Sequence, residues 1–156
     1  MSTEATVRAF FSSPNFAVVG ASTNPAKFGH KIFAWYTQHS IAAVPINPGS
    51  ASIDVGSQSY ATKPSLSALP NPKETSVSII TPPFATLKVL KEAKELGIPA
   101  VWLQPGTFDD EVLKYARATG DDGYGGHVIA GDGGRGSEGW CVLVDGERGL
   151  KAAGKL

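Results

Sequence analysis

The chain has 156 residues, which fits one domain with a single hydrophobic core and leaves no room for a second catalytic domain. Its 14 basic and 14 acidic residues give a formal net charge of zero, so no overall field draws it to nucleic acid or to an anionic membrane. The single cysteine, Cys141, excludes an intramolecular disulfide and argues against a thiolate metal cluster.

Two further features bear on where the chain works. Residues 1–6 have neither the basic start and apolar run of a secretory signal nor the arginine-rich character of a transit peptide. No apolar run approaches the ~20 residues that a membrane-spanning helix requires. Together with the single cysteine, these features predict a cytoplasmic protein with no membrane partner and no nucleic-acid partner.

Short apolar runs alternate with amphipathic segments along the chain. In order, the sequence predicts a strand at 16–19, a helix at 32–38, strands at 42–46 and 77–80, a helix at 84–96, a strand at 100–103 and a helix at about 109–119. The strand runs lack the strict alternation of a half-exposed antiparallel strand, which indicates a parallel sheet covered on both faces. Gly97 predicts the end of the second helix.

Helix-start signals follow the third and fourth predicted strands. Thr81 is a candidate helix cap, and a proline behind it fits the first helical position. Asp109, Asp110 and Glu111 fit the first turn of the last helix, where acids complement the helix dipole. A catalytic role is the alternative for these three acids.

The C-terminal part is rich in glycine. Nine of the twenty residues at 120–139 are glycine, which predicts a flexible loop or insertion without an assigned role. The apolar run at 140–144 predicts a fifth strand. Because strands alternating with helices imply right-handed crossovers, we expect one α/β domain over residues 1–156, with a doubly wound, mostly parallel five-stranded sheet and helices on both faces.

The turn after the first predicted strand has the composition of a phosphate-binding loop. It reads V-V-G-A-S-T-N-P-A-K-F-G over residues 18–29. Gly20 permits a sharp turn, and Gly29 permits close approach where a helix begins. Ser22 and Thr23 offer hydroxyl donors, and Lys27 adds positive charge. The fingerprints G-x-G-x-x-G and G-x-x-x-x-G-K-[ST] are both missing, so an ordinary β–α turn is the alternative.

The charge pattern favours an anionic ligand and distinguishes coenzyme A from NAD and NADP as the nucleotide. Residues 5–53 contain no Asp or Glu. An NAD site places an acid about 20 residues beyond the glycine-rich turn, where this chain has Ile46-Asn47-Pro48-Gly49. NADP favours an arginine near that point, and none is there. Coenzyme A, whose ribose carries phosphate at another position, is compatible with this pattern.

The ends of the other predicted strands offer further ligand contacts, because ligands of open parallel sheets collect at the carboxyl ends of the strands. The Pro82-Pro83 pair can form an apolar wall against an adenine as well as start a helix. Gln104 and Gly106 give a polar side chain and a turn at the same edge. We expect these loops to converge on the first one.

These motifs together resemble the stand-alone CoA-binding domain proteins, Rossmann-like relatives of the N-terminal domain of the succinyl-CoA ligase alpha subunit. The resemblance covers about residues 10–118 and rests on V-V-G-A-S at 18–22, K-F-G at 27–29, P-I-N-P at 45–48, T-P-P at 81–83 and V-W-L-Q-P-G at 101–106. It implies a site for coenzyme A or acyl-CoA. The implied binding residues are Gly20, Ala21, Ser22, Thr23, Lys27, Phe28, Gly29, Asn47, Pro48, Thr81, Pro82, Pro83, Gln104 and Gly106.

The sequence departs from this family in three places. The ligase relatives often carry a lysine after the turn of the second strand, where this chain has Ser50, so Lys27 or Lys63 would have to supply that phosphate contact. The phosphorylated histidine of the ligase belongs to a second domain that this chain lacks, so ligase activity does not carry over. The glycine-rich segment at 120–139 is longer than the usual connection.

Other reactive side chains give weaker signals. Cys141 lies in an apolar run, where a buried and unreactive thiol is expected. The histidines at 30, 39 and 127 have no metal-ligand spacing, although His30 adjoins the loop and is also a candidate phosphate contact. No G-x-S-x-G elbow of a hydrolase is present. We therefore predict no catalytic residue and no metal ligand.

The sequence thus favours a module that binds coenzyme A or acyl-CoA and is not a complete enzyme by itself. One alternative is an NAD(P)-dependent or CoA-transferring enzyme component that needs a partner subunit. The other is an interaction module with a vestigial nucleotide site. A protein partner and a homo-oligomer both remain open.

Overall fold

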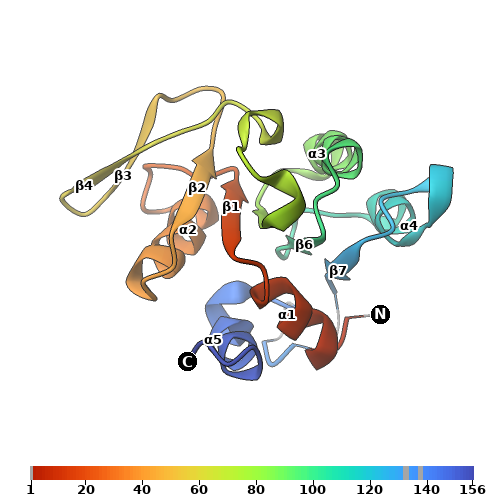
Figure 1. The fold of residues 1–156 in the computed structure, drawn as a ribbon. Helices are drawn as coiled ribbons and strands as arrows, with labels where there is room; N and C mark the ends of the chain where they lie inside the picture. Colours follow the sequence, from red (N-terminus) through yellow and green to blue (C-terminus); the bar gives the residue numbers. More distant parts are fainter. Residues whose placement is uncertain (1, 132–133, 137–138) are drawn as a thin grey trace.

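The computed structural model describes residues 2–131, 134–136 and 139–156. Figure 1 shows the arrangement of its helices and strands. In chain order they are α1 (Glu4–Phe11), β1 (Asn15–Val19), α2 (Phe28–Gln38), β2 (Ala43–Ile46), β3 (Ser52–Val55), β4 (Gln58–Ala61), β5 (Thr75–Ile79), α3 (Pro83–Leu96), β6 (Ala100–Leu103), α4 (Asp110–Arg117), β7 (His127–Ile129) and α5 (Val142–Ala152). Single 3₁₀ turns lie at Leu66–Ala68, Pro72–Glu74 and Gly120–Asp122.

Five strands form one parallel sheet in the order β2-β1-β5-β6-β7. The register sets Val19 beside Ile46 and Ile79, so the carboxyl ends of three strands lie at one level. The prediction of a doubly wound α/β fold is confirmed, and this sheet is parallel throughout. The parallel arrangement brings the loops after the strands to one edge, which we call the carboxyl edge.

Alternate side chains of each strand enter two separate cores on the two faces of the sheet. Phe16, Val18 and Trp102 pack against α1, α2 and α5. Ala17 and Val101 belong to the second core, which includes residues of α3 and α4. The apolar strand runs are thus explained by burial on both faces.

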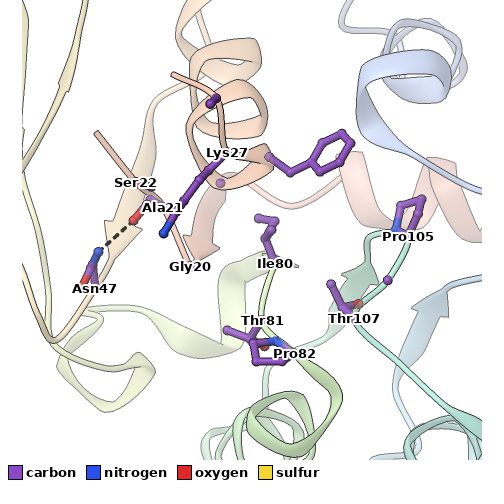
Figure 2. Close-up of a pocket in the computed structure, with 14 residues that line it drawn as sticks. Gly20, Ala21, Ser22, Lys27, Asn47, Ile80, Thr81, Pro82, Pro105 and Thr107 are labelled. Atoms are coloured by element: carbon purple, nitrogen blue, oxygen red, sulfur yellow. Dashed lines mark hydrogen bonds between the residues drawn. The ribbon is translucent and has the colours of Figure 1, made fainter. Parts of the chain in front are cut away.

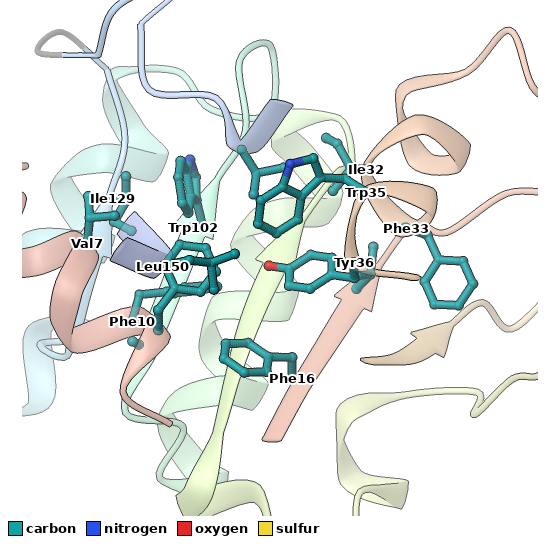
Figure 3. Packing of buried hydrophobic residues seen from close by; sticks show 14 of the residues in the cluster. Val7, Phe10, Phe16, Ile32, Phe33, Trp35, Tyr36, Trp102, Ile129 and Leu150 are labelled. Carbon is teal, nitrogen blue, oxygen red and sulfur yellow. The ribbon is translucent and has the colours of Figure 1, made fainter. Parts of the chain in front are cut away.

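The first core is aromatic. Figure 3 shows the rings of Phe10, Phe16, Tyr36 and Trp102 close together among the side chains of the cluster. Tyr36 pairs through its hydroxyl with Ser78 Oγ at 2.7 Å. Burial raises the pKa of the Tyr36 hydroxyl, because the charged phenolate would lose its hydration there.

The prediction of a fifth strand at 140–144 is wrong. This run begins α5, with Cys141 at the N-cap, and the fifth strand is β7, inside the segment that we expected to be a loop. Buried residues of α5 recur at Val142, Asp145, Gly146 and Gly149, which is helical spacing. The five apolar residues at 140–144 were too short a run to show that period.

Two other parts of the fold were not predicted. Helix α1 precedes the first strand, and its N-cap Thr3 accepts a hydrogen bond from Thr6 N through its side chain. The hairpin β3–β4 follows β2 as a separate two-stranded antiparallel sheet. Ile53 and Val55 alternate with polar residues before Gly56, so the sequence did carry a hairpin signal.

The helices that were predicted are present, with shifted ends. Helix α2 begins at Phe28, four residues before the predicted start, and α3 begins at Pro83 and stops at Gly97, which adopts φ 74°. Asp109 caps α4 by accepting a hydrogen bond from Val112 N at 2.9 Å, which confirms the capping interpretation of the acids there. Among the described residues, no helix is long and apolar enough to cross a membrane.

Candidate functional site

A pocket of about 520 Å³ opens at the carboxyl edge, where the loops after β1, β2, β5 and β6 meet (Figure 2). Segments far apart in sequence therefore share one space, as the parallel sheet requires. The lining residues are Gly20, Ala21, Ser22, Ala26, Lys27, Phe28, Gly29, Asn47, Ile80, Thr81, Pro82, Pro105, Gly106 and Thr107. We call this space the first pocket.

Two glycines fix the turn between β1 and α2. Gly20 adopts φ 96°, and a Cβ on it would collide with the carbonyl oxygen of Ile80. A Cβ on Gly29 would collide with the carbonyl oxygen of Gly20. The start of α2 therefore lies directly against the end of β1, which leaves the backbone of the turn open toward the pocket.

Local hydrogen bonds hold the rest of the turn in shape. Ser22 Oγ accepts from Asn24 N at 3.1 Å, and Asn24 Oδ1 accepts from Ala26 N at 3.0 Å. His30 Nδ1 lies 3.0 Å from the Ser22 carbonyl oxygen. The His30 ring thus braces the turn.

The start of α2 favours an anion electrostatically. Lys27 is its N-cap, no side chain within the described part of the chain caps the helix, and its first turn contains no acid. The first N–H groups of a helix lack partners within the helix and carry the positive end of its dipole. Figure 2 shows the Lys27 side chain extending into the region between Gly20 and Asn47. Positive charge from an ammonium group and from backbone amides therefore meets in one place.

Asn47 connects the loop after β2 to the glycine-rich turn. Its Nδ2 donates to the Ala21 carbonyl oxygen at 2.9 Å, and its Oδ1 accepts from Gly49 N at 2.7 Å. Both halves of the amide are used within the protein, so Asn47 shapes the pocket wall.

The structure brings most of the predicted binding residues to the first pocket. These are Gly20, Ala21, Ser22, Lys27, Phe28, Gly29, Asn47, Thr81, Pro82 and Gly106. Thr23, Pro48, Pro83 and Gln104 lie outside its lining. Four lining residues were not predicted, namely Ala26, Ile80, Pro105 and Thr107. They are chain neighbours of predicted residues, so only an extension of each motif by one or two positions could have found them.

Two of the residues outside the lining have structural contacts. Thr23 Oγ1 accepts from Asp54 N at 3.1 Å and so connects the turn to β3. Pro83 is the first residue of α3 and follows the N-cap Pro82. The prediction that Thr81 caps this helix is wrong: its hydroxyl lies 2.8 Å from Thr86 Oγ1, and no side chain caps α3.

Gln104 is buried and connects β6 to α5. Its Oε1 accepts from Val142 N at 3.0 Å, the first backbone N–H of α5. Gln104 Nε2 is buried without a hydrogen-bond partner among the described residues. The side chain thus anchors the start of α5 at the carboxyl edge and does not line the pocket.

A second pocket of about 500 Å³ lies beside the first, between the end of β2 and α3. Its walls are mostly apolar and include Ile46, Leu66 and Val89, with Lys88 and Glu92 among the lining residues. Thr81 lines both pockets, and Pro48, which was predicted as a binding residue, lines this one. The two spaces are therefore adjacent.

Lys63, which we considered as a substitute phosphate contact, lies beside the end of β2. Its carbonyl oxygen accepts from Asn47 N at 3.0 Å, and its N–H donates to the Pro45 carbonyl oxygen at 3.0 Å. Its neighbour Pro64 lines the second pocket, whereas Lys63 lines neither pocket.

Other groups singled out in the sequence lie elsewhere. Cys141 is buried at the start of α5. His39 Nε2 lies 3.3 Å from Glu147 Oε1, and His127 is exposed at the start of β7. Within the part of the chain that the structure describes, no three His, Cys, Asp or Glu residues are grouped to hold a metal ion.

Solved structures with a similar fold come from archaea and bacteria. A conserved hypothetical protein from Pyrococcus furiosus is 32% identical, with a TM-score of 0.58 over 65% of this chain and 83% of that chain. A hypothetical protein from Pyrococcus horikoshii OT3 is 23% identical, with a TM-score of 0.73 over 96% of this chain and 93% of that chain. The protein described as cell-free ID.343 from Thermus thermophilus is 23% identical in sequence, and its structure has a TM-score of 0.72 over 95% of this chain and 99% of that chain.

No curated protein matches the chain. The family model described as CoA binding domain matches residues 14–130, which include every residue that lines the first pocket. The chain therefore belongs to the CoA binding domain family.

Proposed function

We propose that this chain binds coenzyme A, with the diphosphate of the ligand in the first pocket. The observation that carries the proposal is the meeting of the open start of α2, the Gly20 turn and the Lys27 side chain at the carboxyl edge. Among the described residues that line this pocket, Lys27 is the one that carries a charge. Anions bind at such helix starts because several N–H groups point at the same place.

The second pocket suits the adenine base. Its apolar walls, formed by residues such as Ile46, Leu66 and Val89, can cover the two faces of a flat ring. Because Thr81 lines both pockets, a nucleotide can place its base in the second pocket and its phosphates in the first. The ADP part of coenzyme A has these two features joined by a ribose.

The residue at the end of β2 favours coenzyme A as the ligand over a nicotinamide dinucleotide. The residue after β2 is Asn47, whose amide is hydrogen bonded to Ala21 and Gly49. An NAD site uses a carboxylate near this place to bind the 2′-hydroxyl of the ribose.

We propose an accessory role, in which the chain holds or presents the ligand. The first pocket offers backbone amides, the hydroxyl of Ser22 and one ammonium group, whereas the Thr107 hydroxyl already donates to the Gln104 carbonyl oxygen. This set of groups is suited to holding an anionic ligand by hydrogen bonds and charge.

Calorimetric titration of the full chain with CoA, dephospho-CoA, NAD and NADP tests the proposal. We expect CoA to bind and Lys27→Glu to weaken its binding about tenfold to a hundredfold, because a hydrogen bond to a charged group contributes about 1.5–3 kcal/mol. Lys91→Glu makes the same charge change on α3, away from both pockets, and should leave the affinity unchanged. Preference for a dinucleotide, or no binding of CoA and dephospho-CoA, would contradict the proposal.

A further inference from the structure

Helices α2 and α5 run side by side and in the same direction from the carboxyl edge. Helix α2 starts directly after the Gly20 turn. The first N–H of α5, on Val142, donates to Gln104 at the end of β6. At the other end of α5, Lys155 Nζ donates to the Ser13 carbonyl oxygen, just before β1 begins. Both helices therefore begin at the edge that holds the first pocket.

Contacts farther from the carboxyl edge show which faces of the two helices meet. Gly146 of α5 lies against the Trp35 ring of α2, so closely that a Cβ would collide with it. His39 Nε2 lies 3.3 Å from Glu147 Oε1. We call the contact between the two helices, defined by the pairs Gly146–Trp35 and His39–Glu147, the seam. The buried Trp35 ring fills its interior.

Helical spacing extends this seam toward the first pocket. Leu143 precedes Gly146 by three residues and Glu147 by four, so it lies on the face of α5 that meets α2. Phe28 precedes Trp35 by seven residues, two turns nearer the carboxyl edge on the same face of α2. The two side chains therefore flank the end of the seam that opens at this edge.

Phe28 and Leu143 expose apolar surface at this end, and the Lys31 ammonium lies 5.4 Å from the centroid of the Phe28 ring. Phe28 is 52% exposed and Leu143 is 37% exposed, whereas Trp35 below them is 6% exposed. Phe28 also lines the first pocket, as does Pro105 of the loop after β6. The first pocket and the open end of the seam thus share a wall, and we call the surface of Phe28, Pro105 and Leu143 the seam mouth.

We propose that the seam mouth holds the aliphatic acyl chain of an acyl-CoA. The inference rests on the proposed function, because the Gly20 turn and Lys27 fix the anionic end of the ligand. A ligand arm that leaves the first pocket between Phe28 and Pro105 reaches the seam mouth next. The two turns from Phe28 to Trp35 span ~10 Å along α2, a length comparable to that of an acyl chain of medium length. Burial of that chain would also cover two exposed apolar side chains.

Titration of the full chain with CoA, acetyl-CoA, butyryl-CoA, hexanoyl-CoA and octanoyl-CoA tests the inference. We expect the affinity to rise with chain length by about two- to fourfold for each methylene that becomes buried. Leu143→Ser should abolish this rise while the affinity for CoA itself stays unchanged. Thermal denaturation checks that the variant is folded, and Leu143→Met should retain the rise because it keeps the apolar surface.

Phe84→Ser is the matched control. Phe84 is 76% exposed at the start of α3, which packs on the opposite face of the sheet. This variant should keep the full dependence on chain length. Equal affinity for CoA and all its thioesters would overturn the inference and leave the proposed function standing, whereas no binding of any of them would remove both. Ligand-free dimers that Leu143→Ser converts to monomers would also overturn it, because a second copy would then cover the seam mouth.

Discussion

Gly20 and Gly29 show how single residues determine the geometry of the proposed phosphate site. Each lies so close to a carbonyl oxygen that the space for a Cβ is missing, Gly20 against Ile80 and Gly29 against Gly20. The three backbone segments are therefore packed one on another. A side chain at Gly29 would move the start of α2, and with it Lys27, away from the end of β1, and a side chain at Gly20 would move the turn away from the loop after β5.

We predict that Gly29→Ala destabilises the chain, although alanine is the better helix former. In an exposed helix interior the change would stabilise by about 0.5–1 kcal/mol. Here we expect a loss of about 1–3 kcal/mol in the free energy of unfolding, because the new methyl group meets backbone that cannot rotate away. Urea denaturation measures this difference.

Gly49→Ala is the control for that measurement. A Cβ there would meet only Asn47 Oδ1, at 3.4 Å, and the residue has no positive φ. Its free energy of unfolding should stay within about 0.5 kcal/mol of the parent chain. Equal stability of the two variants would show that close packing at Gly29 does not exclude a side chain.

Among the elements, those marked by an apolar run or by a clear end signal were predicted from the sequence. Strands β1, β2, β5 and β6 were found because each contains a short apolar run, and α3 was found because Gly97 marks its end. Strand β7 has three residues and lies among glycines, so no periodicity could mark it. Helix α5 was missed because its buried face includes Gly146 and Gly149, where glycine permits close packing on Trp35 and Phe11 and gives no hydrophobic signal.

The candidate site was predictable to a similar extent. The glycine-rich turn and the strand ends identified most of the residues around the first pocket. The roles of Asn47 and Gln104 could not be predicted from the sequence. Asn47 bonds to a backbone group 26 residues away, and Gln104 bonds to one 38 residues away. A motif shows which residue is present and not which neighbour it meets after folding.

At the scale of elements, Asp145 joins α5 to the glycine-rich segment before it. The side chain is fully buried, and it accepts hydrogen bonds from Arg135 N at 2.9 Å and Cys141 N at 3.0 Å. Arg148 Nη2 lies 3.4 Å from Asp145 Oδ1, the oxygen that also accepts from Arg135 N. We predict that Asp145→Ala lowers the free energy of unfolding by about 2–5 kcal/mol, because two backbone donors and an arginine lose their acceptor.

Asp145→Asn tests whether these hydrogen bonds are the cause. Asparagine keeps one acceptor oxygen and nearly the same shape, so we expect a smaller loss than with alanine. Glu147→Ala is the matched control, since this acid lies on the same helix and is exposed. Equal stability of Asp145→Ala and Glu147→Ala in urea denaturation would refute the assignment.

At the scale of the whole molecule, the sheet separates two cores, and each contains one buried tyrosine. Tyr36 belongs to the core under α1, α2 and α5, and Tyr124 to the core that includes residues of α3 and α4. Tyr124 donates to the Ile98 carbonyl oxygen at 2.6 Å. Burial raises the pKa of both hydroxyls above the value of 10.0 that tyrosine has in an unfolded chain.

These two tyrosines predict how stability depends on pH in alkaline solution. Above about pH 10 the unfolded chain loses both phenolic protons while the folded chain keeps them, so the free energy of unfolding falls as pH rises. Each tyrosine should contribute a slope of about 1.4 kcal/mol per pH unit. Urea denaturation at several pH values from 8 to 11.5 measures this slope. Tyr36→Phe and Tyr124→Phe should each reduce the slope by the contribution of one tyrosine, and the double variant should remove both contributions. An unchanged slope in either single variant would show that the replaced tyrosine ionises without unfolding.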